Sequence, residues 1–563
     1  MTSTDSSISD VEKLPKMITL PRRIALLILL CLVLLPGINH GIWRPDEPRV
    51  AGICAEMART GDYCVPHLNG RPFLEKPPLY FACGALAGRL FGADKDVPYR
   101  VVSILFAVLT LILTFLIASK RDGPVTGILA ACILASSWQF FHIARWIQVD
   151  IALVFGVTLA MYAYLKLVDK NKLMDSVILG LALGIAFMAK GLVGPVIVAA
   201  AVCTDLIRTK DISLILQSRP FPILLFMLVP VLPWLCGLYI RGGWPFVREV
   251  IVVNNIMRFL GTSEAVALGH QHGILYYFNH FPRDFLPWTF MFIPALVYSI
   301  RNFRDDRFIS WFIGPFVLLC LASTKRGVYL VPLYPAAACM IAQWLSRGSL
   351  KRWEANLQNL TWIIAILGSA LPLAGIFLGR PVLGIIMAFI SLGFAICALK
   401  NKLLKEAKGL ALVLVMCVAL SSSMTIYFSY MKPKEDYLGF TRQVLEQAGT
   451  RQISILGSEE IFEGVLPLLS GRNFPVVDNP ADINEPGLYV WADRHNKVLK
   501  QLKKAGRINV ILEKDIGNKQ ARLAQIIPEI KSSCFPDGST EKINETKYLM
   551  SGKRVAFGGK PYY

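Results

Sequence analysis

The chain has 563 residues, of which 54% are hydrophobic and only 17% are charged. Its mean hydropathy is +0.50, whereas soluble domains average about 25% charged residues. This composition excludes an ordinary soluble protein. The formal net charge is +20, but the basic residues are scattered among short loops instead of forming one stripe, which argues against a nucleic-acid-binding protein.

About 13 apolar segments are long enough to cross a bilayer as helices, which takes roughly 20 residues. The first covers residues 22–38 and begins at a basic pair, Arg22 and Arg23. No small-residue cleavage site follows it, so we interpret it as a retained span and not as a signal peptide. The other spans are predicted near residues 98–118, 124–142, 151–168, 174–190, 191–207, 220–240, 285–300, 308–322, 328–345, 358–378, 381–399 and 409–430.

The placement of charge predicts the orientation of these spans. Short basic loops, such as residues 166–172 and 301–307, recur along the chain, and Lys and Arg stay on the cytoplasmic side of a membrane. Placing these loops inside together with the N-terminus puts the C-terminus outside. Residues 39–97 and 241–284 then become long external loops, and a semi-apolar stretch in the first, residues 79–91, suits a helix at the membrane interface.

The polar tail, residues 431–563, has a different pattern. Short apolar runs predict buried strands, and a helical pattern over residues 496–505 lies between two of them. The strands are expected at residues 453–456, 475–477, 488–491 and 508–512. We therefore predict a polytopic α-helical membrane protein, residues 1–430, followed by a small soluble α/β domain, residues 431–563.

The chain has 12 cysteines, most of them inside apolar segments, where they act as small hydrophobic residues. Cys54 and Cys64 share one polar loop and could form a disulfide if that loop faces an oxidising space. No Cys-x-x-Cys or Cys/His spacing typical of a zinc site is present.

The polar block after the first span carries the strongest functional signal, because charges held against a bilayer are costly. Asp46 and Glu47 are adjacent and cannot share one face, so one of them is expected to point to a site and the other outward or to a cation. The alternative is a helix cap with Pro48 at the first helical position. Further on, two prolines follow Glu75 and Lys76 and fix their direction, which suits a Lys that binds phosphate; the alternative is a snorkelling Lys.

Other charged residues are predicted to lie at the same external face. Asp150 begins one span and Lys190 ends another, while Lys325 precedes a third and Tyr329 lies at its start. A snorkelling Lys would not explain why separate segments bring complementary charges to one face. His270 and His272 could bind a metal, or they are interfacial polar residues, since the pair lacks a full ligand set.

Together these residues resemble the polyprenyl-phosphate-sugar-dependent glycosyltransferases of the C-type membrane fold. Within them the chain is most similar to the protein O-mannosyltransferases and, more closely, to the bacterial aminoarabinose transferases of lipid A. The family pattern appears as Asp46-Glu47-Pro48-Arg49, Glu56-Met57, Gly61-Asp62-Tyr63, Pro66, Asn69-Gly70 and Glu75-Lys76-Pro77-Pro78-Leu79. Later matches are Asp150, Lys190-Gly191, Arg258-Phe259 with His270 and Tyr277, and the segment from Lys325. Val50 departs from the pattern, which usually has Tyr there.

The resemblance implies an inverting transferase that takes a sugar from a polyprenyl phosphate, such as undecaprenyl phosphate, at the outer leaflet of the bacterial inner membrane. It implies a catalytic role for Asp46, with Asp150 and Glu47 in the same site. The donor phosphate would be bound by Arg49, Lys76, Lys190, Tyr329 and Lys325. Glu75 with His270 resembles a divalent metal pair, such as a zinc site, although no cofactor follows as a requirement.

The acceptor implied by the resemblance is lipid A, and the sugar is 4-amino-4-deoxy-L-arabinose or a related pentose or hexose. Glycosylation of a protein or a surface glycan is the alternative within the family. A lipid or solute transporter is the alternative of another class, because polar residues within spans would serve it equally. However, the chain lacks evident paired repeats with broken helices, and its charges gather on one face. A catalytically silent scaffold is disfavoured by the intact Asp46 and Lys76.

Overall fold

The computed structural model describes ten stretches of the chain. They are residues 34–211, 218–261, 271–346, 351–400, 408–457, 460–478, 483, 485–493, 506–516 and 519–527. Most of the predicted span at residues 22–38, and the predicted helix at residues 496–505, therefore lie outside the described residues.

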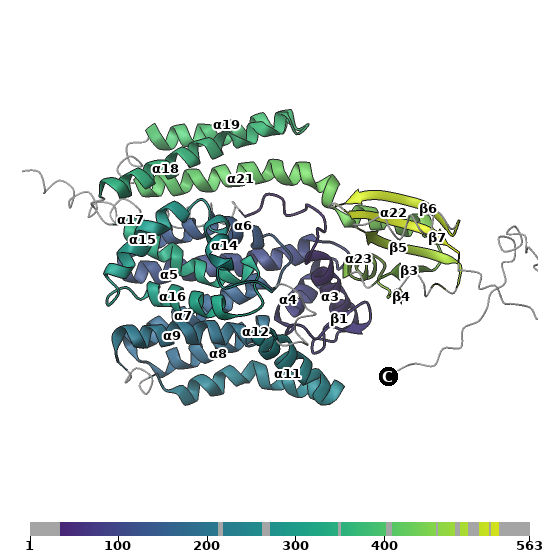
Figure 1. Ribbon diagram of the computed structural model, residues 1–563, viewed down its shortest axis with the longest axis horizontal. Coiled ribbons are helices and arrows are strands. Elements are labelled where there is room, and N and C mark those ends of the chain that lie inside the picture. Colours follow the sequence, from purple (N-terminus) through teal and green to yellow (C-terminus); the bar gives the residue numbers. More distant parts are fainter. Residues whose placement is uncertain are drawn as a thin grey trace, which may run out of the picture.

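A bundle of long apolar helices forms the body of the molecule (Figure 1). Over the described stretches, eight helical segments are long and apolar enough to cross a membrane, and three shorter apolar helices accompany them. The bundle helices are α5 (Val97–Ala135), α7 (Asp150–Lys170), α8 (Leu173–Lys190), α9 (Val193–Thr209), α11 (Pro220–Arg248), α15 (Thr289–Arg301), α16 (Phe308–Leu321), α17 (Tyr334–Leu345), α18 (Arg352–Ala370), α19 (Pro381–Lys400) and α21 (Lys408–Glu435). The predicted multi-pass helical fold is confirmed, but the predicted number of 13 spans is not.

The number of spans counted depends partly on α5, because this one helical segment contains two of the predicted spans. Asp122 and Gly123 within it have non-helical backbone angles. A Cβ atom on Gly127 would collide with the carbonyl of Phe115, so the residues on either side of the break pack against each other. The chain therefore turns back at Gly123, whose φ of 87° favours glycine.

Residues 241–260, the first part of the loop predicted over residues 241–284, are helical. The chain kinks at Gly243 but stays helical through α11, the π-helix η1 (Glu249–Met257) and α12 (Arg258–Leu260). A second helix, α14 (Tyr276–Asp284), follows residues 262–270, which lie outside the described stretches. The Gly-Gly-Trp-Pro run at residues 242–245 reads as a loop signal, yet the aliphatic residues after it continue the helix.

The first polar block is folded and not an open loop. It contains α3 (Glu47–Thr60), a short hairpin of β1 (His67–Leu68) and β2 (Arg71–Pro72), and α4 (Leu79–Phe91). The hairpin turns at Asn69 and Gly70, both with positive φ. Cys54 and Cys64 are both free, so they do not form the disulfide that the sequence allowed.

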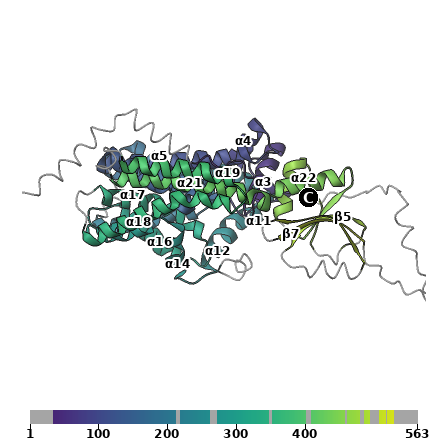
Figure 2. The same cartoon turned by 90° about the horizontal axis from the view of Figure 1, so that it is seen from above.

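A five-stranded mixed sheet lies at one end of the bundle (Figures 1 and 2). Its strand order is β4-β3-β5-β7-β6, with β3 parallel to β4 and β5, and β7 antiparallel to β5 and β6. The strands are β3 (Ile453–Leu456), β4 (Val476–Val477), β5 (Gly487–Asp493), β6 (Ile508–Ile516) and β7 (Lys519–Ile526), and the helices are α22 (Tyr437–Ala448) and α23 (Glu460–Ser470). The four predicted strands are present, and β7 is an additional one.

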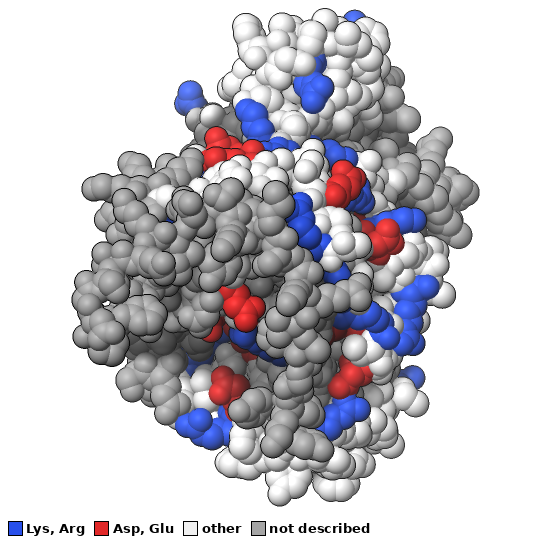
Figure 3. Space-filling view, turned by 90° about the vertical axis from the view of Figure 1, so that its right-hand side faces the viewer, with Lys and Arg blue, Asp and Glu red and all other residues white. Residues whose placement is uncertain are grey.

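The C-terminal sheet region is attached to the first polar block. Helices α3 and α23 cross so closely that a Cβ on Gly52 or Gly464 would collide with the backbone of the other helix. Asn69 donates to the Phe474 carbonyl at 2.8 Å and accepts from the Phe474 amide at 2.7 Å. This end of the molecule carries side chains of both charges (Figure 3). Segments about 400 residues apart in sequence thus form one polar end.

Candidate functional site

A cavity of about 670 Å³ joins an apolar part to a charged part. Its apolar wall comes from the start of α9, the end of α16 and α12, and includes Val193, Val196, Ile197, Phe259, Leu260, Leu318 and Leu319. Its charged residues are Asp46, Arg49, Glu75, Lys76, Asp150, Lys190, Arg258, Arg326 and Glu460. Such a cavity can hold an amphiphile with an acyl or prenyl chain and an anionic head.

Asp46 lies at the charged end, just before α3. Its Oδ1 is 3.0 Å from Arg49 Nη2, and its Oδ2 is 2.9 Å from Arg326 Nη2. Burial alone would raise the pKa of Asp46, but Arg326 and then Arg49 lower it below its ordinary value. Asp46 occupies the N-cap position of α3, as the alternative prediction has it, but its side chain makes no capping hydrogen bond.

Gln148 connects Asp46 to the second predicted carboxylate. Its Nε2 donates to Asp150 Oδ2 at 2.9 Å and lies 3.4 Å from Asp46 Oδ2. Asp150, the first residue of α7, also pairs with Lys190 at the end of α8. The Lys190 ammonium lies 4.0 Å from the centre of the Tyr329 ring, which favours a cation–π contact.

Glu75 and Lys76 both line the cavity. Lys76 Nζ is 3.4 Å from Glu75 Oε2, which is also 3.8 Å from Arg49 Nη1. Burial, and then the charge of Arg49, lower the pKa of Lys76 to about 8. Two cations therefore already neutralise Glu75, and Lys76 is a partly desolvated cation suited to an anionic ligand.

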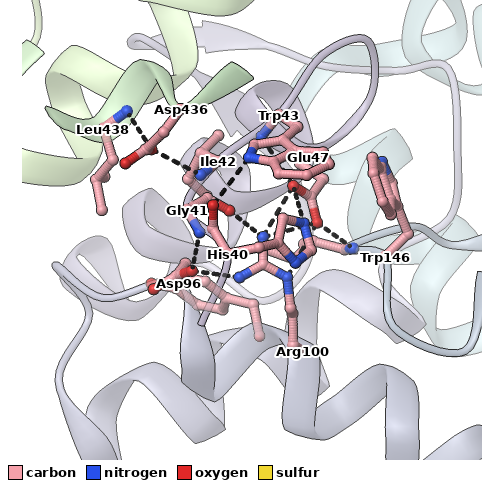
Figure 4. A network of polar contacts seen from close by, with 12 residues as sticks. His40, Gly41, Ile42, Trp43, Glu47, Asp96, Arg100, Trp146, Asp436 and Leu438 are labelled. Atoms are coloured by element: carbon pink, nitrogen blue, oxygen red, sulfur yellow. Dashed lines mark hydrogen bonds and ion pairs between the residues drawn. The ribbon is translucent and has the colours of Figure 1, made fainter. Parts of the chain in front are cut away.

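Glu47 does not line the cavity. It is fully buried, and Figure 4 shows it in a network with Arg100 and His40. Arg100 Nη2 is 2.9 Å from both carboxylate oxygens, while the amides of Trp43 and Ile147 donate at 2.8 and 3.1 Å. Burial would raise the pKa of Glu47, but Arg100 holds it at about 2. The catalytic role predicted for Glu47 has no support in this geometry, which is that of a structural ion pair.

Lys325 does not line the cavity either. Its ammonium donates to the carbonyls of His272, at 2.9 Å, and Ala322. The neighbouring Arg326 faces Asp46 instead. Arg258 is a further cation of the cavity, and its Nε is buried with no hydrogen-bond partner among the residues that the structure describes. The sequence placed Arg258 in the Arg-Phe motif and Arg326 beside Lys325, but neither arginine was assigned a role in the site.

Of the predicted metal pair, Glu75 lines the cavity, whereas His270 lies outside the described residues. Within the described part of the chain, no group of three or more His, Cys, Asp and Glu side chains could hold a metal ion. Glu75 contacts Lys76 and Arg49 there, an arrangement that does not favour a metal ligand.

A second, smaller cavity of about 240 Å³ adjoins the first. Both cavities are lined by Pro45, Asp46, Gln148 and Arg326. The rest of the smaller cavity is mostly polar and includes Gln139, His142, Tyr276, His280, Arg283 and Asp284. Asp46 and Arg326 therefore line both an amphipathic cavity and a polar one.

The fold is that of the polytopic membrane glycosyltransferases of the C-type fold. Residues 75–236 match the family model of the dolichyl-phosphate-mannose-protein mannosyltransferases. The crystal structure of ArnT from Cupriavidus metallidurans bound to undecaprenyl phosphate superimposes with a TM-score of 0.74 at 18% identity, covering 89% of this chain and 97% of that one. This likeness shows the fold.

Two relatives are undecaprenyl phosphate-alpha-4-amino-4-deoxy-L-arabinose arabinosyl transferases. The protein from Serratia proteamaculans (strain 568) is 28% identical over 444 residues, 73% of this chain and 79% of that protein. The protein from Pectobacterium carotovorum subsp. carotovorum (strain PC1) is 27% identical over 380 residues. These residues make up 66% of this chain and 66% of that protein, slightly under two thirds. The resemblance predicted from the polar block is thus confirmed: this chain is a relative of the polyprenyl-phosphate-dependent membrane glycosyltransferases.

Proposed function

We propose that this protein transfers a sugar from a polyprenyl phosphate to an acceptor at the membrane surface. The observation that carries the proposal is the amphipathic cavity: one end is apolar, and the other gathers five cations against four carboxylates. The apolar wall suits a prenyl chain, and the excess of positive charge suits its phosphate. Transporters also contain polar residues within spans, but an apolar-to-cationic cavity that ends at a buried carboxylate favours an enzyme.

The donor phosphate is bound, in this proposal, by Lys76, Lys190 and Arg258. Arg258 lines the cavity, and its buried Nε has no hydrogen-bond partner among the residues that the structure describes. Lys76 is partly desolvated. Positive groups fixed where negative charge develops on the departing phosphate lower the barrier to its departure. Arg49 is already paired with three carboxylates, so it supports the site more than it binds the phosphate. Tyr329 orients Lys190 through its ring.

Asp46 is the proposed catalytic carboxylate, with Asp150 assisting through Gln148. Its two arginine partners keep it ionised, so it can stabilise positive charge on the anomeric carbon or accept a proton from a hydroxyl acceptor. The bond from the acceptor oxygen to the anomeric carbon forms as the carbon–oxygen bond to polyprenyl phosphate breaks, with inversion. The electron pair of the broken bond leaves with the phosphate.

We infer from the relatives that the donor lipid is undecaprenyl phosphate, that the sugar is 4-amino-4-deoxy-L-arabinose, and that the acceptor is lipid A. Purified protein should then move this sugar from undecaprenyl phosphate to lipid A, as seen by a mass increase in the lipid A product. Transfer to a protein or a surface glycan but not to lipid A would refute this acceptor.

The phosphate site is tested with Lys76→Ala. Losing one charge-assisted hydrogen bond typically costs about 1.5–3 kcal/mol, which lowers affinity roughly tenfold or more. Binding of undecaprenyl phosphate to the purified variant should weaken accordingly, whereas Lys95→Ala, at an exposed position outside the cavity, serves as the control. Unchanged affinity in Lys76→Ala would refute the assignment.

We also propose that the site faces the outer side of the bacterial inner membrane. The alternating basic loops support this orientation, as does the attachment of the tail, residues 431–563, to the polar block as a soluble domain. Alkaline phosphatase fused after Glu435 should therefore be active. An inactive fusion there, with a fluorescent cytoplasmic reporter at the same position, would reverse the orientation.

A further inference from the structure

The five residues that end at Arg326 connect α16 to the 3-10 helix η2 (Gly327–Leu333). The backbone is extended at both ends of this connection, at Ala322 and at Arg326. Side chains of an extended chain alternate between its two sides, so Lys325 and Arg326 point in opposite directions. Arg326 reaches Asp46 at 2.9 Å, whereas the Lys325 ammonium turns away from the cavity. A shift of this connection would therefore move Arg326 relative to Asp46.

Helix α12 holds one side of the connection. The Ser323 amide donates to the Phe259 carbonyl at 3.0 Å, and the Thr324 hydroxyl donates to the Arg258 carbonyl at 3.1 Å. None of these contacts involves the side chain of Lys325. The cavity cation Arg258 therefore keeps its attachment to the connection when only the Lys325 side chain is changed.

Lys325 holds the other side. The residue is only 2% exposed, and its ammonium donates to the His272 carbonyl at 2.9 Å and to the Ala322 carbonyl. Beside it, Gln271 and Thr324 form an isolated antiparallel bridge. Burying a cation is costly unless hydrogen bonds satisfy it, and an ammonium has enough N–H groups to join two carbonyls, which an apolar side chain cannot do. Lys325 thus cross-links residues 271–272 to the connection.

We propose that Lys325 is a positioning residue: its ammonium fastens residues 271–272 to the connection and so directs the Arg326 guanidinium onto Asp46. The inference rests on the proposed transferase function and adds to it a residue that touches neither donor nor acceptor. This role differs from that of a phosphate ligand, which the resemblance implied for Lys325. A positioning role requires that catalysis change while binding of the donor phosphate does not.

The first test is Lys325→Met, which removes the N–H groups and keeps a long side chain. A displacement of about 1 Å near reacting groups can cost on the order of 100-fold in rate, and we expect kcat to fall about tenfold because only one partner of Asp46 is displaced. The affinity for undecaprenyl phosphate should stay unchanged, since Arg258 keeps its own anchors. Lys325→Gln keeps two N–H donors and should lose less activity than Lys325→Met.

The second test is a double-mutant cycle with Arg326→Ala, measured as the single-turnover rate of sugar transfer. If Lys325 acts through Arg326, adding Lys325→Met to Arg326→Ala should cause no further loss. Lys432→Met is the matched control, because the Lys432 ammonium also donates to a backbone carbonyl, that of Asn39 at 2.6 Å, but lines neither cavity. The control should transfer at the wild-type rate.

The inference is overturned if Lys325→Met keeps the wild-type kcat, or if its loss adds fully to that of Arg326→Ala. Weaker binding of undecaprenyl phosphate with unchanged kcat would also overturn it and return Lys325 to the phosphate site. If melting curves show that Lys325→Met does not fold, the same cycle with Lys325→Gln decides. Failure of the proposed function is a different result, because the wild-type protein would then not bind undecaprenyl phosphate.

Discussion

Glu460 is a residue of the C-terminal region that lines the amphipathic cavity. Its Oε1 is 2.8 Å from Arg49 Nη1, and Arg49 Nη2 is 3.0 Å from Asp46 Oδ1. Glu460 begins α23, whose close crossing with α3 sets its position. We expect Glu460 to act as a positioning residue that fixes Arg49, and through Arg49 the direction of the Asp46 carboxylate.

The expected loss of rate on removing Glu460 follows from the solvent exposure of the Glu460–Arg49 ion pair. Two unit charges about 4 Å apart attract by about 4 kcal/mol at an effective dielectric of 20, whereas exposed pairs contribute only about 0–1 kcal/mol. Glu460 is 47% exposed and Arg49 is nearly buried, so solvent screens much of the attraction. We take about 1 kcal/mol for the loss of alignment, which corresponds to about fivefold in rate.

Glu460→Ala should therefore lower kcat about fivefold without raising the donor KM, because removing a negative charge does not weaken binding of a phosphate. Glu460→Gln, which keeps a hydrogen-bond acceptor, should show a smaller loss. The assay is transfer of a labelled sugar from undecaprenyl phosphate under single-turnover and steady-state conditions.

Asn473→Ala is the control, since it removes an exposed 3.1 Å hydrogen bond to Arg59 in the same contact between regions, away from the cavity. The reasoning is refuted if Glu460→Ala turns over at the wild-type rate, or if Asn473→Ala is slowed as much. A large drop in melting temperature with Glu460→Ala would likewise contradict it, because the loss would then come from detachment of α23.

Substitutions at the two adjacent carboxylates should affect different properties. Asp46→Asn should slow transfer by roughly 10²–10⁴-fold with little change in melting temperature. Glu47→Gln breaks a buried ion pair and should destabilise the protein by about 3–5 kcal/mol. Transfer assays and thermal unfolding of both variants check this pair, and an active Asp46→Asn would move the catalytic role to Asp150. The affinity for undecaprenyl phosphate should fall as pH rises through about 8, since Lys76 loses its proton there and only the charged form attracts phosphate. Lys76→Arg stays charged and should bind equally at pH 7 and pH 9; the same fall in this variant would show that Lys76 is not the titrating group.

Local patterns were sufficient to predict the membrane fold and much of the site. Apolar segments report spans directly, because length and hydropathy are properties of one stretch of chain. The two prolines after Lys76 fix its direction without help from distant residues. The helix from Pro220 to Leu260 shows the limit of such signals: glycine and proline at residues 242–245 indicate a loop, but they produce only a kink because apolar residues on both sides favour a helix.

Contacts between segments far apart in the sequence determine which side chains face the cavity, and local sequence patterns do not predict these contacts. Lys325 and Arg326 are equivalent in a sequence, yet the chain between α16 and the following 3-10 helix (Gly327–Leu333) turns the Lys325 ammonium onto backbone carbonyls and Arg326 onto Asp46. Glu460 enters the site from 411 residues beyond Arg49, and no pattern near it indicates this contact. Side-chain direction of this kind depends on tertiary packing, which periodicity does not report.

The charge balance of the amphipathic cavity explains why a pair of adjacent acids is useful at its mouth. Glu47 is enclosed with Arg100, so the start of α3 is rigid before any ligand binds. That rigidity holds Asp46 between Arg49 and Arg326 at the wall shared by both cavities. With four carboxylates against five cations, the cavity keeps one positive charge in excess, and this excess becomes useful only when a phosphate enters. Electrostatic preorganisation of this kind favours the departing phosphate in the transition state more than the intact donor.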